Sequence, residues 1–153
     1  MDLTTTEREA VSDLLAQIRQ IGEDFTHEYV GRTMVMAPKN RLLFMMSRDT
    51  GETLLSAFAD TVSLLDDPEK LSKALTFLGQ ESPPLAEIHR WAKEFDLGVE
   101  CFNWAARRCL GEAFTPPAQS GHRKLALIRR AAIMSGLMQA IWPRSEPAPQ
   151  RPA

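Results

Sequence analysis

The chain has 153 residues, of which 44% are hydrophobic and 25% are charged, and its formal net charge is −2. A chain of this length is expected to form one domain that buries about 70% of the surface exposed by the unfolded chain. This composition excludes an intrinsically disordered protein, and a core of this size needs no disulfide staples.

The near-neutral total hides an uneven distribution of charge along the chain. Residues 1–100 carry 10 Lys and Arg against 18 Asp and Glu, a net charge of −8, whereas residues 101–153 carry 8 against 2, a net charge of +6. We therefore expect a molecule with one acidic and one basic side. Arginine outnumbers lysine by 13 to 5, which is typical of a GC-rich bacterial source or its phage.

The N-terminal sequence and the apolar runs favour a cytoplasmic location. The opening MDLTTTEREA lacks the basic region and the apolar stretch of a secretory signal. The longest apolar run reaches Trp142 about a dozen residues after Arg130, whereas a membrane-spanning helix needs about 20. We expect no membrane segment.

The first predicted helix starts in the sequence TTTEREAV. Thr6 and Glu9, three residues apart, are typical of a capping box, and Gly31 is expected to end the helix. Gly22 weakens the helix slightly. Apolar residues then recur at helical spacing: Val11, Leu14, Leu15, Ile18, Ile21 and Phe25.

Residues 33–48 permit two interpretations. In one, TMVMA and RLLFMMS are strands, with RDTG as the turn of a short β-hairpin. In the other, a short helix begins at Pro38. After residue 52 the apolar spacing is helical, with Asp49 and Glu52 as a capping pair. Four methionines of this segment suit either a core or an adaptable surface, and we favour the core: Met34, Met36, Met45 and Met46.

Two further helices are predicted to form an antiparallel pair. Asp67 caps the first, Pro68 opens it and Gly79 ends it, whereas Ser82 precedes the second. The link between them is only a few residues long, as in helical hairpins. The inward residues are Leu71, Leu75 and Leu78 in the first helix and Leu85, Ile88, Trp91, Ala92 and Phe95 in the second.

The C-terminal part of the chain predicts two more helices. In LGVECFNWAARRCLG one face carries Val99, Phe102, Ala106, Cys109 and Leu110, and Gly111 is expected to end that helix. TPPAQSG is expected to be a loop, after which a helix runs from near Ser120 to Trp142. Residues 1–142 are thus expected to form one all-α bundle of six or seven helices, followed by a disordered proline-rich tail at residues 143–153.

No motif predicts catalysis, a metal or a cofactor. Asp24 and His27 form the only near match to the Glu-x-x-His pairs of di-iron bundles, and there is no nucleophile elbow or phosphate loop. Cys101 and Cys109 on one helix would lie about 12 Å apart, too far for a disulfide. We expect reduced thiols, with Cys109 buried and inert.

Basic residues on the last helix are the first candidate binding surface. His122 and Arg129 are seven residues apart, as are Arg123 and Arg130, which predicts a stripe on one side of the helix. Such a stripe could contact nucleic-acid phosphates, stay solvated, or face the acidic first helix. Because no aromatic residue interleaves the arginines, an acidic protein partner is favoured.

Small residues on the same helix predict a close helix contact. Ala132, Gly136 and Ala140 recur every four residues and form a shallow groove. A second apolar row means that the helix is either central in the bundle or shared with another chain, as in a homodimer. That row consists of Leu127, Met134, Met138 and Ile141.

We expect a non-catalytic interaction protein, such as an adaptor, escort or inhibitor, oriented on a partner by its charge. Trp104 lies off the predicted inward face and is a candidate anchor, although it could instead pack under the following loop. The alternative is a nucleic-acid-binding regulator that uses the same basic residues. These residues are Arg107, Arg108, Arg123, Arg129 and Arg130.

Overall fold

The computed structural model describes residues 2–36, 58–81 and 88–141, and within these ranges the chain is helical with no strand. The elements are α1 (Thr5–Ile21), α2 (Glu23–Met36), α5 (Pro68–Glu81), α6 (Ile88–Leu110), the 3₁₀ turn η2 (Gly111–Ala113) and α7 (Pro116–Ile141). Residues 58–63 are also helical, as predicted for the chain after residue 52. The predicted all-α fold is confirmed.

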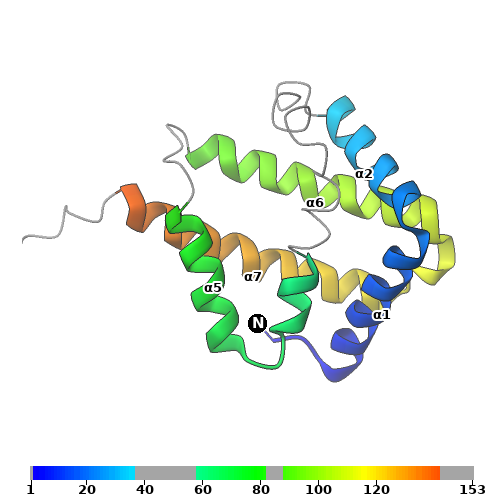
Figure 1. Cartoon of the computed structure of the whole chain (residues 1–153), viewed down its shortest axis with the longest axis horizontal. Coiled ribbons are helices and arrows are strands. Elements are labelled where there is room, and N and C mark those ends of the chain that lie inside the picture. The colour runs from blue at the N-terminus through cyan, green and yellow to red at the C-terminus, as the bar shows by residue number, and fades with distance from the viewer. Residues whose placement is uncertain (1, 37–57, 82–87, 142–153) are drawn as a thin grey trace, which may run out of the picture.

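Helix α7 is the element against which the others are arranged (Figure 1). Helix α1 packs on its N-terminal half, α5 crosses its C-terminal half, and α6 runs beside it with α2 on α6. The predicted antiparallel pair is therefore wrong, because α5 packs on α7 rather than on α6. The C-terminal half of α7 buries Ile133 and Leu137, and α5 buries Leu71 and Leu75 in the same core.

The capping box of α1 begins at Thr4. The Glu7 amide donates to Thr4 Oγ1 at 3.1 Å, and the Thr4 amide donates to Glu7 Oε1 at 2.9 Å. The prediction of Thr6 and Glu9 is wrong by two residues. Three consecutive threonines allow the capping box to start at different residues. The observed start places the carboxylate of Glu7, rather than that of Glu9, where residues of α7 bind it.

A break at Gly22 divides the first predicted helix into α1 and α2. Gly22 has φ of 65°, a backbone conformation that favours glycine, and its amide closes α1 on the Ile18 carbonyl. Helix α2 continues through Gly31, the predicted stop, and reaches Met36. The strand predicted from Thr33 is therefore wrong for residues 33–36, and the rest of the proposed hairpin lies outside the described residues.

The start of α5 confirms its predicted cap. The Lys70 amide donates to Asp67 Oδ1 at 3.1 Å, and Pro68 occupies the first helical position. The helix continues two residues beyond Gly79, to Glu81.

Helix α6 joins two helices that were expected to be separate. It spans 23 residues and passes through Gly98 without a break, then ends where Gly111 adopts φ of 55°. Gly111 is the predicted stop.

Helix α7 starts earlier than expected because Thr115 caps it. The Ala118 amide donates to Thr115 Oγ1 at 3.3 Å, and Pro116 is the first helical residue. This is the same cap-and-proline signal as at the start of α5, so the loop predicted for TPPAQSG is wrong from Pro116 onward. The predicted tail, residues 143–153, lies outside the described part of the chain.

A very close approach to a glycine occurs where α1 crosses α7. A Cβ atom at Gly121 would lie 2.6 Å from Val11 Cγ2 and 3.0 Å from the Glu7 carbonyl oxygen.

Of the small residues predicted to form a packing groove, Gly136 is buried and Ala132 is half-buried, whereas the side chain of Ala140 is not described. None of the helices in the described ranges is long and apolar enough to cross a bilayer.

Candidate functional site

Two guanidinium groups contact the indole of Trp104 where α6 packs on α2. The Arg32 guanidinium of α2 is 4.9 Å from the centroid of the indole, and that of Arg108 is 5.4 Å away. Both distances are typical of cation–π contacts. The half-buried indole also touches the edge of the hydrophobic core. Arg108 reaches the indole because it is one helical turn beyond Trp104, whereas Arg32 comes from α2.

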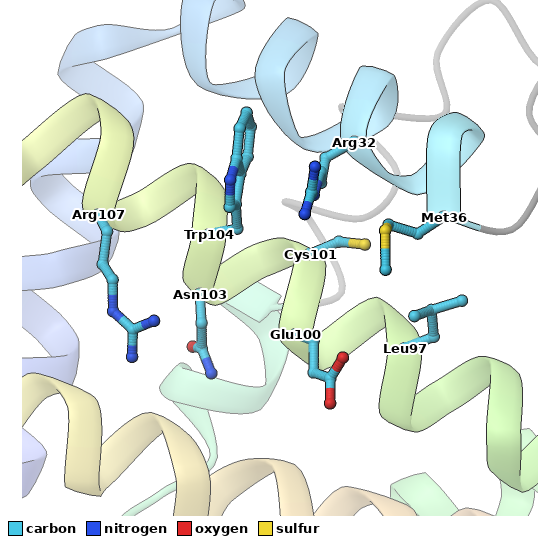
Figure 2. A pocket seen from close by; sticks show the side chains of 8 residues that line it. All are labelled: Arg32, Met36, Leu97, Glu100, Cys101, Asn103, Trp104 and Arg107. Carbon is cyan, nitrogen blue, oxygen red and sulfur yellow. The ribbon is translucent and has the colours of Figure 1, made fainter.

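A groove of about 340 Å³ runs along α6 beside this indole (Figure 2). Leu97, Cys101 and Trp104 occupy the side of α6 that faces Arg32 and Met36 of α2. A second row, directed away from α2, lines the groove with polar side chains: Glu100, Asn103 and Arg107. Within each row the residues are three or four positions apart, as expected for one side of a helix. This spacing can be read from the sequence, but a search for apolar residues alone misses it because one row is polar.

Charge in the groove is partly unpaired. Arg107 is exposed, and neither Arg107 nor Arg32 forms an ion pair with a carboxylate of the described residues. By contrast, Arg108 Nε lies 3.1 Å from Glu28 Oε2. The Asn103 side-chain oxygen is buried without a hydrogen-bond partner. A ligand in the groove would meet two cations and one carboxylate, that of Glu100.

The two cysteines are free thiols with raised pKa values. Burial raises the pKa of Cys101, although a hydrogen bond with Thr33 opposes it. Burial also raises the pKa of Cys109, which is half-buried rather than fully buried as expected, and nearby carboxylates add to the effect. Neither thiol is activated as a nucleophile.

The predicted basic stripe of α7 does not form one exposed surface. His122 is buried, and Arg129 is largely enclosed beside the ring of Phe95. Arg130 donates to both carboxylate oxygens of Asp96, at 2.9 and 3.3 Å. Of the four predicted residues, Arg123 is the exposed one. Seven-residue spacing correctly paired 122 with 129 and 123 with 130, but the two pairs are about 100° apart around the helix.

Ion pairs join the acidic and basic halves of the sequence. In the described residues, Lys124 pairs with Glu7, Arg130 with Asp96 and Arg108 with Glu28. Part of the charge that is separated along the chain is therefore neutralised within the molecule. Lys124, which is not a member of the predicted stripe, pairs with the first helix, whereas Arg130 of the stripe pairs with α6.

Glu7 is the most enclosed member of these pairs. Its carboxylate accepts hydrogen bonds from Lys124 Nζ at 2.8 Å and from Ser120 Oγ at 2.5 Å. These bonds, that of Lys124 foremost, lower the pKa of Glu7 to about 2. Glu7 therefore serves both the cap of α1 and the contact between α1 and α7.

A second cavity, of about 200 Å³, lies between α2, α6 and α7. Aromatic rings form much of its wall, including Phe58, Phe95 and Phe102. His122 and Arg129 of α7 and Tyr29 of α2 also line it. The cavity therefore combines aromatic walls with ionisable side chains.

Metal binding has no support in the described ranges, where no group of three or more His, Cys, Asp or Glu side chains is placed to hold an ion. No protein-family model matches the chain, and no curated protein matches it either. The geometry of the groove and of the cavity is therefore the basis for inferring function.

Proposed function

We propose that this protein is a non-catalytic interaction module that binds an acidic segment of a partner protein in the groove between α2 and α6. The observation that carries the proposal is the indole of Trp104, flanked by guanidinium groups, beside the unpaired Arg107. Tryptophan and arginine are the residues most enriched where binding energy concentrates in protein interfaces.

The groove offers apolar contact in addition to the indole. Met36, at the end of α2, is 43% exposed, and its neighbour Val35 is 71% exposed. Flexible methionine side chains adapt to the shape of a bound residue. An aromatic or aliphatic side chain of the partner would pack between Met36, Leu97 and Trp104.

The charges of the groove favour an acidic partner. Arg32 and Arg107 have no carboxylate partner in the described part of the chain, whereas Glu100 is the one acidic side chain of the lining. Unpaired cations at the margin of an interface accelerate the approach of an acidic segment and set its register.

Nucleic-acid binding, the alternative function, is less well supported by this geometry. It requires several arginines free to contact phosphates along one surface. On α7, Arg129 is largely enclosed, Arg130 is bound to Asp96 and Lys124 is bound to Glu7. Binding of plain duplex or single-stranded DNA or RNA at low salt would favour the alternative over our proposal.

Selection from a phage-displayed peptide library tests the proposal. We expect the wild-type protein to enrich acidic peptides that contain an aromatic or large aliphatic residue. Arg107→Glu should abolish the enrichment, and the matched control Arg123→Glu, which makes the same charge change outside the groove, should preserve it. Met36→Ser should weaken binding without unfolding the protein.

Two outcomes of this selection would contradict the proposal. One is a wild-type protein that enriches no acidic peptide. The other is equal loss of binding in Arg107→Glu and Arg123→Glu, which would assign the effect to total charge rather than to the groove.

A further inference from the structure

The cavity beside His122 is separate from the proposed partner groove. It is lined by α2 through Tyr29, by α6 through Gly98 and Phe102, and by α7 through His122 and Arg129. The groove and this cavity share no lining residue.

His122 lines this cavity and carries a polar atom without a hydrogen-bond partner. Its side chain is 5% exposed, and Nδ1 is buried with no hydrogen-bond partner. The imidazole is fixed by stacking on Phe102, with ring centroids 4.1 Å apart, and by an edge contact with Phe58. A buried polar atom without a partner costs free energy, so a ligand that bonds to it is favoured.

Arg129 brings a cation to the same cavity. Its Nε is also buried without a partner, and the guanidinium lies 5.9 Å from the centroid of Phe95. No carboxylate of the described residues pairs with it, although Glu94 also lines the cavity and makes other contacts. A largely buried guanidinium is stabilised by an anion that accepts from its planar fork.

We propose that this cavity binds a small organic anion with an apolar body, such as a monocyclic aromatic carboxylic acid. The carboxylate would accept from Arg129, with the Tyr29 hydroxyl and His122 as further hydrogen-bonding groups. The apolar body would lie against Phe58, Phe102 and the neighbouring aliphatic side chains: Val99 and Ala126.

The size of the cavity agrees with such a ligand. An apolar protein cavity of about 150 Å³ holds benzene. The present cavity measures about 200 Å³, which leaves room for one carboxylate beside a ring. A polyphosphate or a nucleotide would be too large and too polar for these aromatic walls.

Titration of the intact protein with benzoate tests this inference, with benzyl alcohol as a neutral ligand of similar shape. We expect benzoate to bind at least about tenfold more tightly than benzyl alcohol. Arg129→Met should weaken benzoate binding by about tenfold or more, whereas Arg130→Met, which removes a surface guanidinium one residue away, should not change it.

A second variant tests the cavity without removing a charge. Gly98→Leu would place a side chain in the cavity, because a Cβ added at Gly98 would lie 3.8 Å from the Tyr29 hydroxyl. It should abolish benzoate binding. Gly31→Leu is the matched control, since a Cβ there meets nothing within 4 Å.

Three results would overturn the inference. They are no binding of benzoate to the wild type at millimolar concentration, equal affinity for benzoate and benzyl alcohol, or equal effects of Arg129→Met and Arg130→Met. The last result would assign benzoate to the protein surface. None of these results depends on whether a peptide binds in the groove.

Discussion

The imidazole of His122 stacks on the ring of Phe102, with centroids 4.1 Å apart and planes inclined by 15°. This contact joins α7 to α6 at the centre of an aromatic cluster that also contains Phe25, Tyr29 and Phe58. Burial, with a smaller contribution from the nearby Arg129, lowers the pKa of His122 to about 3. The histidine therefore packs in this core as a neutral ring.

Acid should destabilise the protein through His122 at a higher pH than through Glu7. The folded-state pKa lies below the unfolded value, so the unfolded chain binds the proton first and stability falls as the pH drops below about 6.5. Between pH 6.5 and 4.5 we expect a loss on the order of 2 kcal/mol in the free energy of unfolding. Urea titrations across this range measure it.

His122→Phe is the control for this pH dependence. It keeps an aromatic ring in the cluster and removes the titrating group, so the slope between pH 6.5 and 4.5 should disappear. If the variant keeps the wild-type slope, another group causes the loss.

Protonation of Glu7 should control the stability of the protein in a second, more acidic pH range. Its folded-state pKa of about 2 is below the reference value of 4.5, so the stabilisation it provides is complete above pH 4.5 and is lost as the pH falls through about 2. Glu7→Gln should flatten the stability profile in this range alone. An unchanged profile below pH 4.5 would show that the pairing with Lys124 and Ser120 has no effect on folding.

The register of the first cap can be tested with two threonines. Thr4→Ala should lower the free energy of unfolding by about 1 kcal/mol, because it removes the acceptor for the Glu7 amide. Thr6→Ala, at the cap that the sequence predicted, should change it by about 0.5 kcal/mol at most. Equal effects of the two substitutions would contradict a cap at Thr4.

Two helical glycines should respond in opposite directions to alanine. Gly121→Ala should destabilise the protein by about 2 kcal/mol, because the added Cβ would lie 2.6 Å from Val11 Cγ2. Gly98→Ala should stabilise it by about 0.5–1 kcal/mol, since its Cβ meets only an ordinary contact at 3.8 Å. Thermal unfolding distinguishes the two, and a stabilised Gly121→Ala would contradict the observed crossing of α1 and α7.

Local signals in the sequence predicted some helix ends correctly, although α5 continues past its predicted stop at Gly79. The cap Asp67 with Pro68 and the stop Gly111 lie where expected. The same kind of signal stands at Thr115 and Pro116, although the two adjacent prolines there also suit a loop. Gly22 and Gly31 could not be distinguished by residue type: the helix is interrupted at Gly22, whereas Gly31 lies inside α2, which packs on α6.

The candidate sites were less predictable, because they depend on contacts between distant helices. Periodicity correctly paired His122 with Arg129, but it could not show that this pair faces the core. Trp104 is a candidate from the sequence because it lies off the apolar face, yet the partner that flanks it, Arg32, is 72 residues away in the sequence. Only the fold brings these two residues together.

The most direct test of the proposed function is a charge exchange between the groove and a bound peptide. An acidic peptide selected by the wild-type protein would be titrated against the wild type and against Arg107→Glu. Variants of this peptide, each with one acidic residue replaced by lysine, would then be titrated against Arg107→Glu. We expect Arg107→Glu to bind the acidic peptide at least about tenfold more weakly, and one lysine peptide to restore most of the lost affinity. Equal affinity of both proteins for the acidic peptide, or no rescue by any lysine peptide, would contradict the assignment of this groove as the partner-binding site.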